Sequence, residues 1–143
     1  MIKRLRLALL SDAPRLFAWR NDESTRMASH NSAFISLASH LAWLELAIAS
    51  PRRKLYIYEE SRLPCATLRA DLCPEGDWQL SWTVAPDKRG RGIAKNMVAL
   101  MVANSNLHFC AQIKKENLAS AKVAEFVGMR LEKECEGILY YYK

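Results

Sequence analysis

The sequence predicts one α+β domain, with a mixed central sheet of about seven strands flanked by about four helices. Three observations lead to this fold class. The chain has 143 residues, which suits one domain built around one core. Its residues are 50% hydrophobic and 25% charged, a composition typical of globular proteins. Strand-like and helix-like hydrophobic periods alternate without a repeat or linker, so we treat residues 1–143 as a single domain.

The N-terminal third predicts one strand followed by two helices. Partly alternating apolar residues indicate a strand over residues 1–10. Helices are expected over 11–19 and 39–50, with Ser11 and Ser39 as their N-caps. The segment 21–32 between them is polar and irregular, and we expect a loop or a short helix there.

The rest of the chain predicts six strands and two helices, bounded by turn residues. The strands are expected over residues 55–59, 63–72, 77–84, 108–114, 131–135 and 138–142. The helices are expected over 92–103 and 117–127. Asn117 is the expected cap of the second helix, and Gly128 is expected to end it.

The segment from Val84 to Lys95 is the strongest functional signal. It leaves a strand through a proline and a basic, glycine-rich turn, and it opens directly into a helix. Such a turn leaves backbone N–H groups unpaired at the positive end of the helix dipole, which favours a phosphate or pyrophosphate. The residues expected at this ligand are Arg89, Gly90, Arg91, Gly92, Ile93, Ala94 and Lys95.

Two common nucleotide motifs do not fit this turn. A Walker A loop ends in Gly-Lys-Ser/Thr, which is absent, and a dinucleotide fingerprint needs glycine or alanine where Lys95 stands. The pattern Arg/Gln-x-x-Gly-x-Gly/Ala does fit, at Arg89, Gly92 and Ala94. With Trp82-Thr83-Val84 before it, the turn resembles the acetyl-CoA pyrophosphate loop of the GNAT superfamily of N-acetyltransferases. The alternative is an ordinary surface turn at a helix start.

A second motif supports the same resemblance. Asn117-Leu118-Ala119-Ser120, followed by Gly128-Met129, is similar to the Asn-x-x-Ser and Gly-Phe of that family. The resemblance implies acetyl-CoA as co-substrate, with Asn117 and Ser120 facing its pantetheine and phosphate region. It also implies that Trp82, Thr83 and Val84 bind the cofactor through a strand that diverges from its neighbour. Alone, Asn117 could be only a helix cap and Ser120 a solvated hydroxyl.

A third group of residues indicates the acceptor. Trp19-Arg20-Asn21-Asp22, then Ile35, His40 and Trp43, resembles the acetyltransferases that modify nucleotide-linked amino sugars. Ribosomal-protein acetyltransferases are related in the same region. The resemblance implies transfer of acetyl to the primary amine of a small molecule by direct attack in a ternary complex. The alternative function is a protein N-terminal acetyltransferase. The alternative interpretation of Trp19 and Trp43 is that they are core residues without a role in binding.

The usual acid and base positions of the family hold residues that exchange no protons. Gln79 and Gln112 stand where relatives carry glutamates, and Ala124 stands where many carry a tyrosine. Asp71 and His30 are the candidate catalytic substitutes. The alternatives are a strand-end carboxylate paired with Arg69 for Asp71, and an ordinary surface residue for His30. The substitutions also leave open a non-catalytic acyl-CoA-binding domain.

Composition limits the expected partners. The net charge of +6 comes from basic residues spread along the chain, without a nucleic-acid-binding motif. We therefore expect a small anionic ligand and no nucleic acid, membrane or metal. The four cysteines form no Cys-x-x-Cys pair, which favours reduced thiols in a cytoplasmic protein. The sequence leaves the oligomeric state open, and a homodimer is compatible with it.

Overall fold

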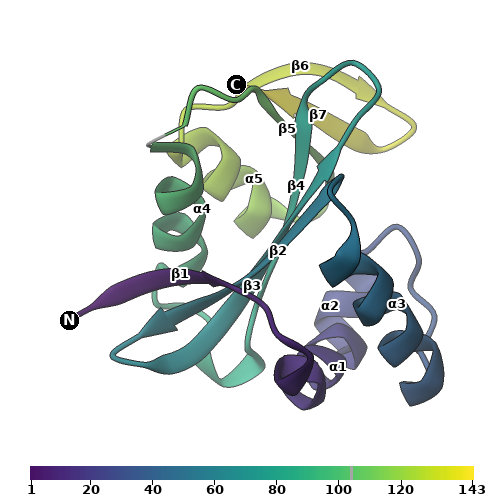
Figure 1. Ribbon diagram of the computed structural model, residues 1–143. Helices are drawn as coiled ribbons and strands as arrows, with labels where there is room; N and C mark the ends of the chain where they lie inside the picture. Colours follow the sequence, from purple (N-terminus) through teal and green to yellow (C-terminus); the bar gives the residue numbers. More distant parts are fainter. Residues whose placement is uncertain (104) are drawn as a thin grey trace.

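A seven-stranded sheet runs through the molecule and separates two groups of helices (Figure 1). The computed structural model describes residues 1–103 and 105–143. The strands are β1 Lys3–Leu7, β2 Arg53–Glu60, β3 Leu63–Leu72, β4 Trp78–Val84, β5 Phe109–Lys114, β6 Arg130–Cys135 and β7 Ile138–Tyr142. Their order is β1-β2-β3-β4-β5-β7-β6, and neighbours run antiparallel except for the parallel pair β4–β5.

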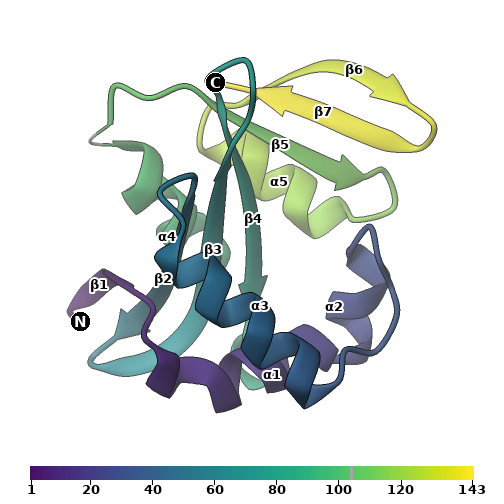
Figure 2. The ribbon, with the colours of Figure 1, turned by 45° about the vertical axis from the view of Figure 1, so that its right-hand side comes forward.

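Helices cover both faces of this sheet (Figures 1 and 2). On one face lie α1 Ala13–Asn21, α2 Glu23–Ala28 and α3 Leu37–Ala49, whereas α4 Ile93–Ala103 and α5 Leu118–Phe126 cover the other. The predicted α+β class and mixed seven-stranded sheet are confirmed. Five α-helices stand where about four were predicted, because the segment 21–32 contains α2.

Each face of the sheet has its own hydrophobic core, because alternate residues of a strand point to opposite faces. The core under α4 and α5 includes Leu68, Leu80, Met97, Phe109 and Ala124, none more than 2% exposed. The core under α1 and α3 includes Leu16, Trp19, Leu44, Leu55 and Ile57. Full burial of one such side chain contributes about 1.5–3 kcal/mol, so the two cores fix the helices on the sheet.

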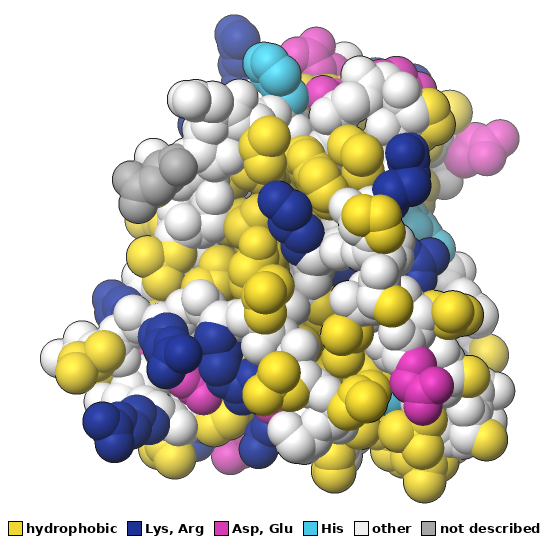
Figure 3. All heavy atoms as spheres, in the orientation of Figure 1, with side chains coloured by type: hydrophobic (Ala, Val, Ile, Leu, Met, Phe, Trp, Pro, Cys, Tyr) yellow, Lys and Arg dark blue, Asp and Glu magenta, His cyan; other side chains and the backbone are white. Residues whose placement is uncertain are grey.

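Positive charge is spread over the surface. Figure 3 shows Lys and Arg side chains on several parts of one face, with a group at its lower left. On β1, Lys3 and Arg4 are exposed. No helix within 1–103 or 105–143 has the length and apolar character needed to cross a membrane.

The helix ends partly match their sequence signals. Asn117 caps α5 as predicted, since its Oδ1 accepts the N–H of Ser120 at 3.2 Å. Gly128 follows α5 with φ of +91°, which confirms it as the residue that ends the helix. The predicted Ser39 cap is wrong, because Ser36 Oγ accepts the N–H of Ser39 at 3.2 Å and α3 begins at Leu37.

Asp12 turns the chain out of the first strand and into the first helix. Its side chain is 1% exposed, and Oδ2 accepts the N–H of Leu9 at 2.8 Å. The guanidinium of Arg6 donates to both carboxylate oxygens at 2.8 Å. The strand predicted over residues 1–10 therefore stops at Leu7, and Asp12 precedes α1 where Ser11 was expected to cap it.

Replacing Asp12 with Asn should destabilise the protein by about 3 kcal/mol, because breaking a buried ion pair leaves a charge without its partner. Burial alone would raise the pKa of the Asp12 carboxyl, but hydrogen bonds from Arg6 and Leu9 lower it below its usual value. The stabilisation is therefore complete above the unfolded-state pKa and is lost as pH falls through the lower folded-state pKa. Urea unfolding at pH 7 and in acid measures both effects. Equal stability of Asp12→Asn and wild type at pH 7 would contradict this account.

Candidate active site

The parallel strands β4 and β5 part soon after they meet. They pair only at Trp78 with Phe109 and at Gln79 with Cys110. Beyond Gln79, β4 stays paired with β3 as far as Val84, and β5 stays paired with β7 as far as Lys114. The predicted divergence next to β4 is thus present, and the inner edges of both strands open into a groove.

Backbone polar groups of β4 are free in this groove. Ala85 donates its N–H to Cys65 on the β3 side, and Trp78 donates to His108 on the β5 side. Because an antiparallel strand alternates its hydrogen-bonding direction, the peptide groups of Trp82 and Val84 also point to the β5 side. No strand within residues 1–103 and 105–143 pairs with them there, so they can bind an extended ligand as an added strand would.

The glycine turn forms one end of the groove. Gly90 and Gly92 have φ of +79° and +73°, a conformation that residues with a side chain rarely adopt. A Cβ built on Gly92 would meet no atom within 4 Å, so the backbone there faces open space. The helix α4 starts directly after it, at Ile93, and the first N–H groups of an α-helix have no partner within the helix itself. The turn is therefore shaped to receive an anion.

A cavity of about 910 Å³ joins this turn to the helices α1–α3. Most of the residues predicted to bind the cofactor line it, namely Trp82, Thr83, Val84, Arg89, Gly90, Gly92, Ile93, Ala94, Lys95, Asn117 and Ser120. Arg91 does not line the cavity, and its Nη2 donates to the carbonyl of Asp87 at 3.4 Å.

The charge of the cavity lining has one sign. Within residues 1–103 and 105–143, no Asp or Glu lines it. Six cationic side chains do: Arg20, Arg69, Lys88, Arg89, Lys95 and Lys122. Sequence reasoning did not name Arg69, Lys88 or Lys122 as site residues. The signal for Arg69 was its alternation with Thr67 along β3, which puts both on the face towards α1–α3.

The candidate acid–base residues fall in different places. His30 lines the cavity, in the loop after α2. Asp71 does not line it; Arg69 Nε donates to Asp71 Oδ2 at 2.9 Å, and Arg53 Nε lies 3.6 Å from Asp71 Oδ1. The paired strand-end carboxylate is therefore the arrangement observed for Asp71. Gln79 and Gln112 meet at the base of the groove, with Gln112 Nε2 3.4 Å from Gln79 Oε1.

Trp19 and Arg20 line the cavity, and the next two residues, Asn21 and Asp22, brace the segments around it. Arg20 Nη2 donates to the carbonyl of Asn31 at 2.9 Å. Asn21 clamps the loop before α3, since its amide both donates to and accepts from the backbone of Ile35 at 2.8 Å. Asp22 Oδ2 caps α2 by accepting the N–H of Thr25 at 3.1 Å. The segment thus holds the loop 29–36 against the groove.

Aromatic rings line the same wall. The ring of His40 lies 5.7 Å from that of Trp43 and 5.7 Å from that of Phe17. Arg69 stacks over Trp43, with its guanidinium carbon 5.7 Å from the ring centre. Burial, with repulsion from Arg20, lowers the pKa of His40 below its usual value, so this imidazole is neutral at pH 7.

Comparisons with known proteins agree with this geometry. Residues 4–130 match a family model described as the acetyltransferase (GNAT) domain. No curated protein matches the sequence. No group of three or more His, Cys, Asp or Glu side chains suited to a metal ion occurs in the part of the chain that the structure describes.

Solved structures share the fold at low sequence identity. A spermidine N-acetyltransferase from Vibrio cholerae, in complex with CoA and spermine, has a TM-score of 0.86 and 13% identity over 99% of this chain and 94% of that one. An aminoglycoside acetyltransferase in complex with coenzyme A has a TM-score of 0.82 and 16% identity, over 99% and 94%. A ribosomal alpha-N-protein acetyltransferase in complex with coenzyme A has a TM-score of 0.82 and 16% identity, over 99% and 93%.

Replacing Gly92 with Val should abolish binding of CoA, because the branched side chain strains the turn and covers its N–H groups. Binding is measured as thermal stabilisation, which reaches about 2.7 kcal/mol at a hundredfold excess of ligand over Kd. Gly137→Val is the matched control. Gly137 has φ of +79° and no atom within 4 Å of its built Cβ, and it lies in the β6–β7 turn away from the cavity. A Gly92→Val variant that CoA still stabilises would move the site elsewhere.

Proposed function

We propose that this chain acetylates the primary amine of a nucleotide-linked amino sugar. The premise is that the chain belongs to the acetyltransferase (GNAT) domain family. The enzyme is an N-acetyltransferase with acetyl-CoA as its co-substrate. One observation carries the proposal for the acceptor: the described part of the chain contributes cationic residues to the cavity but no carboxylate.

The charge of the cavity argues against cationic acceptors. Polyamines and aminoglycosides carry several ammonium groups, and burying them requires carboxylates to pair with. Asp22 and Asp71 lie outside the cavity lining, where Asp22 is paired with Arg89 and Asp71 Oδ2 with Arg69. An acceptor that brings its own negative charge is favoured instead, because it neutralises the positive field of the site.

Two buried nitrogen atoms on the acceptor wall support an anionic, hydrogen-bonding acceptor. Arg20 Nη1 and His40 Nδ1 are buried and have no hydrogen-bond partner within residues 1–103 and 105–143. Burial, with repulsion from Arg69 and Arg26, lowers the pKa of Arg20 below its usual value. A phosphate beside Arg20 would relieve this cost, and the half-buried ring of Trp43, which lines the same cavity, can contact a nucleobase.

The fit to the co-substrate rests on the groove and the glycine turn. The free N–H groups of Trp82 and Val84 can hold the pantetheine arm, and the turn at Gly90 and Gly92 can hold the pyrophosphate. Acetyl-CoA supplies an activated acetyl group as a thioester. A backbone N–H of β4 stabilises the negative charge that develops on a carbonyl oxygen held against it. The walls from α1–α3 hold the amine close to that carbonyl, which removes entropy from the reaction step.

Proton handling in the proposed reaction falls to His30 and to the charge of the cavity. Gln79 and Gln112 position polar groups but take no proton at neutral pH. The cationic lining lowers the pKa of any acceptor ammonium, since like charges disfavour the protonated form. His30, at the mouth formed by the loop after α2, can pass the released proton to solvent. The amine would then form the new C–N bond as the C–S bond breaks, CoA would leave as a thiolate, and the proton lost by the nitrogen would pass to this thiolate or to solvent.

A panel of acceptors tests the substrate class. With acetyl-CoA, mass spectrometry should show acetyl transfer to nucleotide-linked amino sugars and little transfer to polyamines, aminoglycosides or peptides with free N-termini. Turnover of polyamines alone would contradict the charge argument. Turnover of peptides would instead identify a protein N-terminal acetyltransferase. Thermal stabilisation by acetyl-CoA without turnover of any amine would favour the non-catalytic acyl-CoA-binding alternative.

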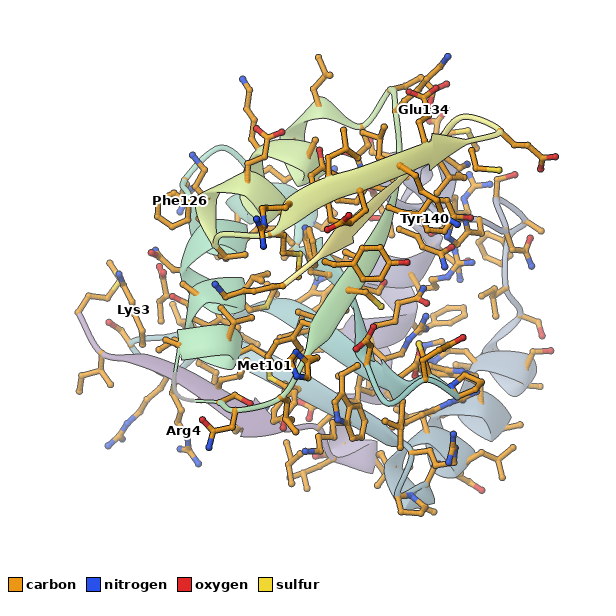
Figure 4. All side chains as sticks on the ribbon, turned by 90° about the horizontal axis from the view of Figure 1, so that it is seen from above. Lys3, Arg4, Met101, Phe126, Glu134 and Tyr140 are labelled. Atoms are coloured by element: carbon orange, nitrogen blue, oxygen red, sulfur yellow. The ribbon has the colours of Figure 1, made fainter. Side chains whose placement is uncertain are left out.

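Replacing Arg20 with Gln should raise the KM for the anionic acceptor about tenfold to a hundredfold, because hydrogen bonds to charged groups are worth about 1.5–3 kcal/mol. The KM for acetyl-CoA should stay within about twofold of wild type. Arg4→Gln is the control, because it removes the same charge from an exposed position on β1 that does not line the cavity (Figure 4), and it should change neither constant. Equal acceptor KM values for the two variants would show that Arg20 does not bind the acceptor.

A further inference from the structure

The short helix α2 lines the cavity, and a hydrogen bond to another segment anchors each of its ends. At its start, Asp22 accepts a hydrogen bond from Arg89 of the glycine turn. At its other end, the carbonyl of Met27 accepts a hydrogen bond from Lys114 Nζ, at the end of β5, at 2.9 Å. Both anchors therefore come from the segments that border the groove. Ser24, Thr25 and Ala28 of this helix line the cavity between them.

The anchor at Asp22 joins three groups. Its Oδ2 lies 2.5 Å from Arg89 Nη2, 3.1 Å from the backbone nitrogen of Thr25 and 3.3 Å from Thr25 Oγ1. Arg89 Nη2 also lies 3.2 Å from Thr25 Oγ1. The side chains of Asp22 and Arg89 are 22% and 39% exposed, so water screens the pair only partly. The hydrogen bond from Arg89 lowers the pKa of Asp22 below its usual value, so the carboxylate is charged at neutral pH.

This contact is decisive for α2 because the helix has little stability of its own. It has six residues, and isolated helices shorter than about 12 residues are marginal in water. Its only buried residue is Thr25, so packing contributes little. The hydrogen bonds at its two ends must therefore hold it in place against the cavity.

We propose that Asp22 and Arg89 are positioning residues that couple the glycine turn to α2, so that a cofactor pyrophosphate bound at the turn further stabilises the acceptor wall. A pyrophosphate held by the turn fixes the backbone that carries Arg89 and gives its guanidinium a second anion to bind. The guanidinium fork can serve Asp22 through Nη2 and still present its other N–H groups to a phosphate. Ordering of Arg89 thereby orders Asp22, the cap of α2 and the loop that carries His30.

The coupling works in both directions. If the cofactor raises the affinity of the acceptor wall for its ligand, then an acceptor must raise the affinity for the cofactor by the same factor. The inference rests on the proposed binding of acetyl-CoA at the glycine turn, and it does not depend on the identity of the acceptor.

Hydrogen exchange of the amides of residues 23–30, with and without CoA, tests the proposal in wild type and in Asp22→Asn. Asparagine is as good an N-cap as aspartate, so this variant keeps the cap and removes only the ion pair. In wild type, CoA should slow exchange in this segment by up to about fivefold, the full effect of an ion pair worth about 1 kcal/mol. In Asp22→Asn the slowing should disappear. CoA should still stabilise this variant thermally, at least as strongly as wild type, because one carboxylate near the phosphates is gone.

Two further variants make the result specific. Glu23→Gln removes a neighbouring exposed carboxylate of α2 and should behave like wild type. Arg89→Gln should lose the slowing in the same way as Asp22→Asn, and combining the two substitutions should add nothing further.

The outcomes separate the failure of this inference from the failure of the proposed function. Absence of any thermal stabilisation by CoA in wild type would overturn both. Stabilisation without slower exchange in wild type would overturn the coupling alone. Slowing that persists in Asp22→Asn would show that the ion pair does not carry it. Loss of CoA binding in Asp22→Asn would place the role of Asp22 in the turn itself and overturn its action on α2.

Discussion

The early parting of β4 and β5 is the constraint on which the rest of the site depends. Each strand keeps a full partner on its outer side, β3 for β4 and β7 for β5, so neither needs the other beyond two residue pairs. The helices on the two faces keep the strands in place while their inner edges stay open. The unpaired peptide groups of Trp82 and Val84 are costly unless water or a ligand binds them. A ligand that adopts the path of a missing strand satisfies them.

Charge decides what can lie along that path. One end of the groove meets the glycine turn and the start of α4, where backbone N–H groups favour pyrophosphate. The other end meets Arg20 and Arg69, whose positive charge makes the acceptor end attractive to anions too. The ion pair between Asp22 and Arg89 lies between these ends. A carboxylate placed there balances one cation without entering the cavity lining, and it ties the acceptor wall to the cofactor loop.

The local structure around the glycine turn and the start of α5 was more predictable from the sequence than that of the wall formed by α1–α3. Residues around Gly92 and Asn117 carry their signal locally, in turn chemistry and helix capping that depend on a few neighbouring positions. The order of elements was also predictable, because hydrophobic periods report which face each residue buries. The ends of β1 and α3 were not predictable in this way. The contact between Asp12 and Arg6 accompanies the end of β1, and Ser36, not Ser39, caps α3. The pairing of Asp71 with Arg53 and Arg69, and of Asp22 with Arg89, likewise depends on the register of strands and on the packing of α2.

Residue-resolved hydrogen exchange along β4, with and without CoA, tests the central claim most directly. If the cofactor binds as an added strand, the amides of Trp82 and Val84 should become protected when CoA is added. Those of Ser81 and Thr83, which point to β3, should stay unchanged. The account predicts this alternation of period two. Protection spread evenly over β4, or confined to Ser81 and Thr83, would contradict it.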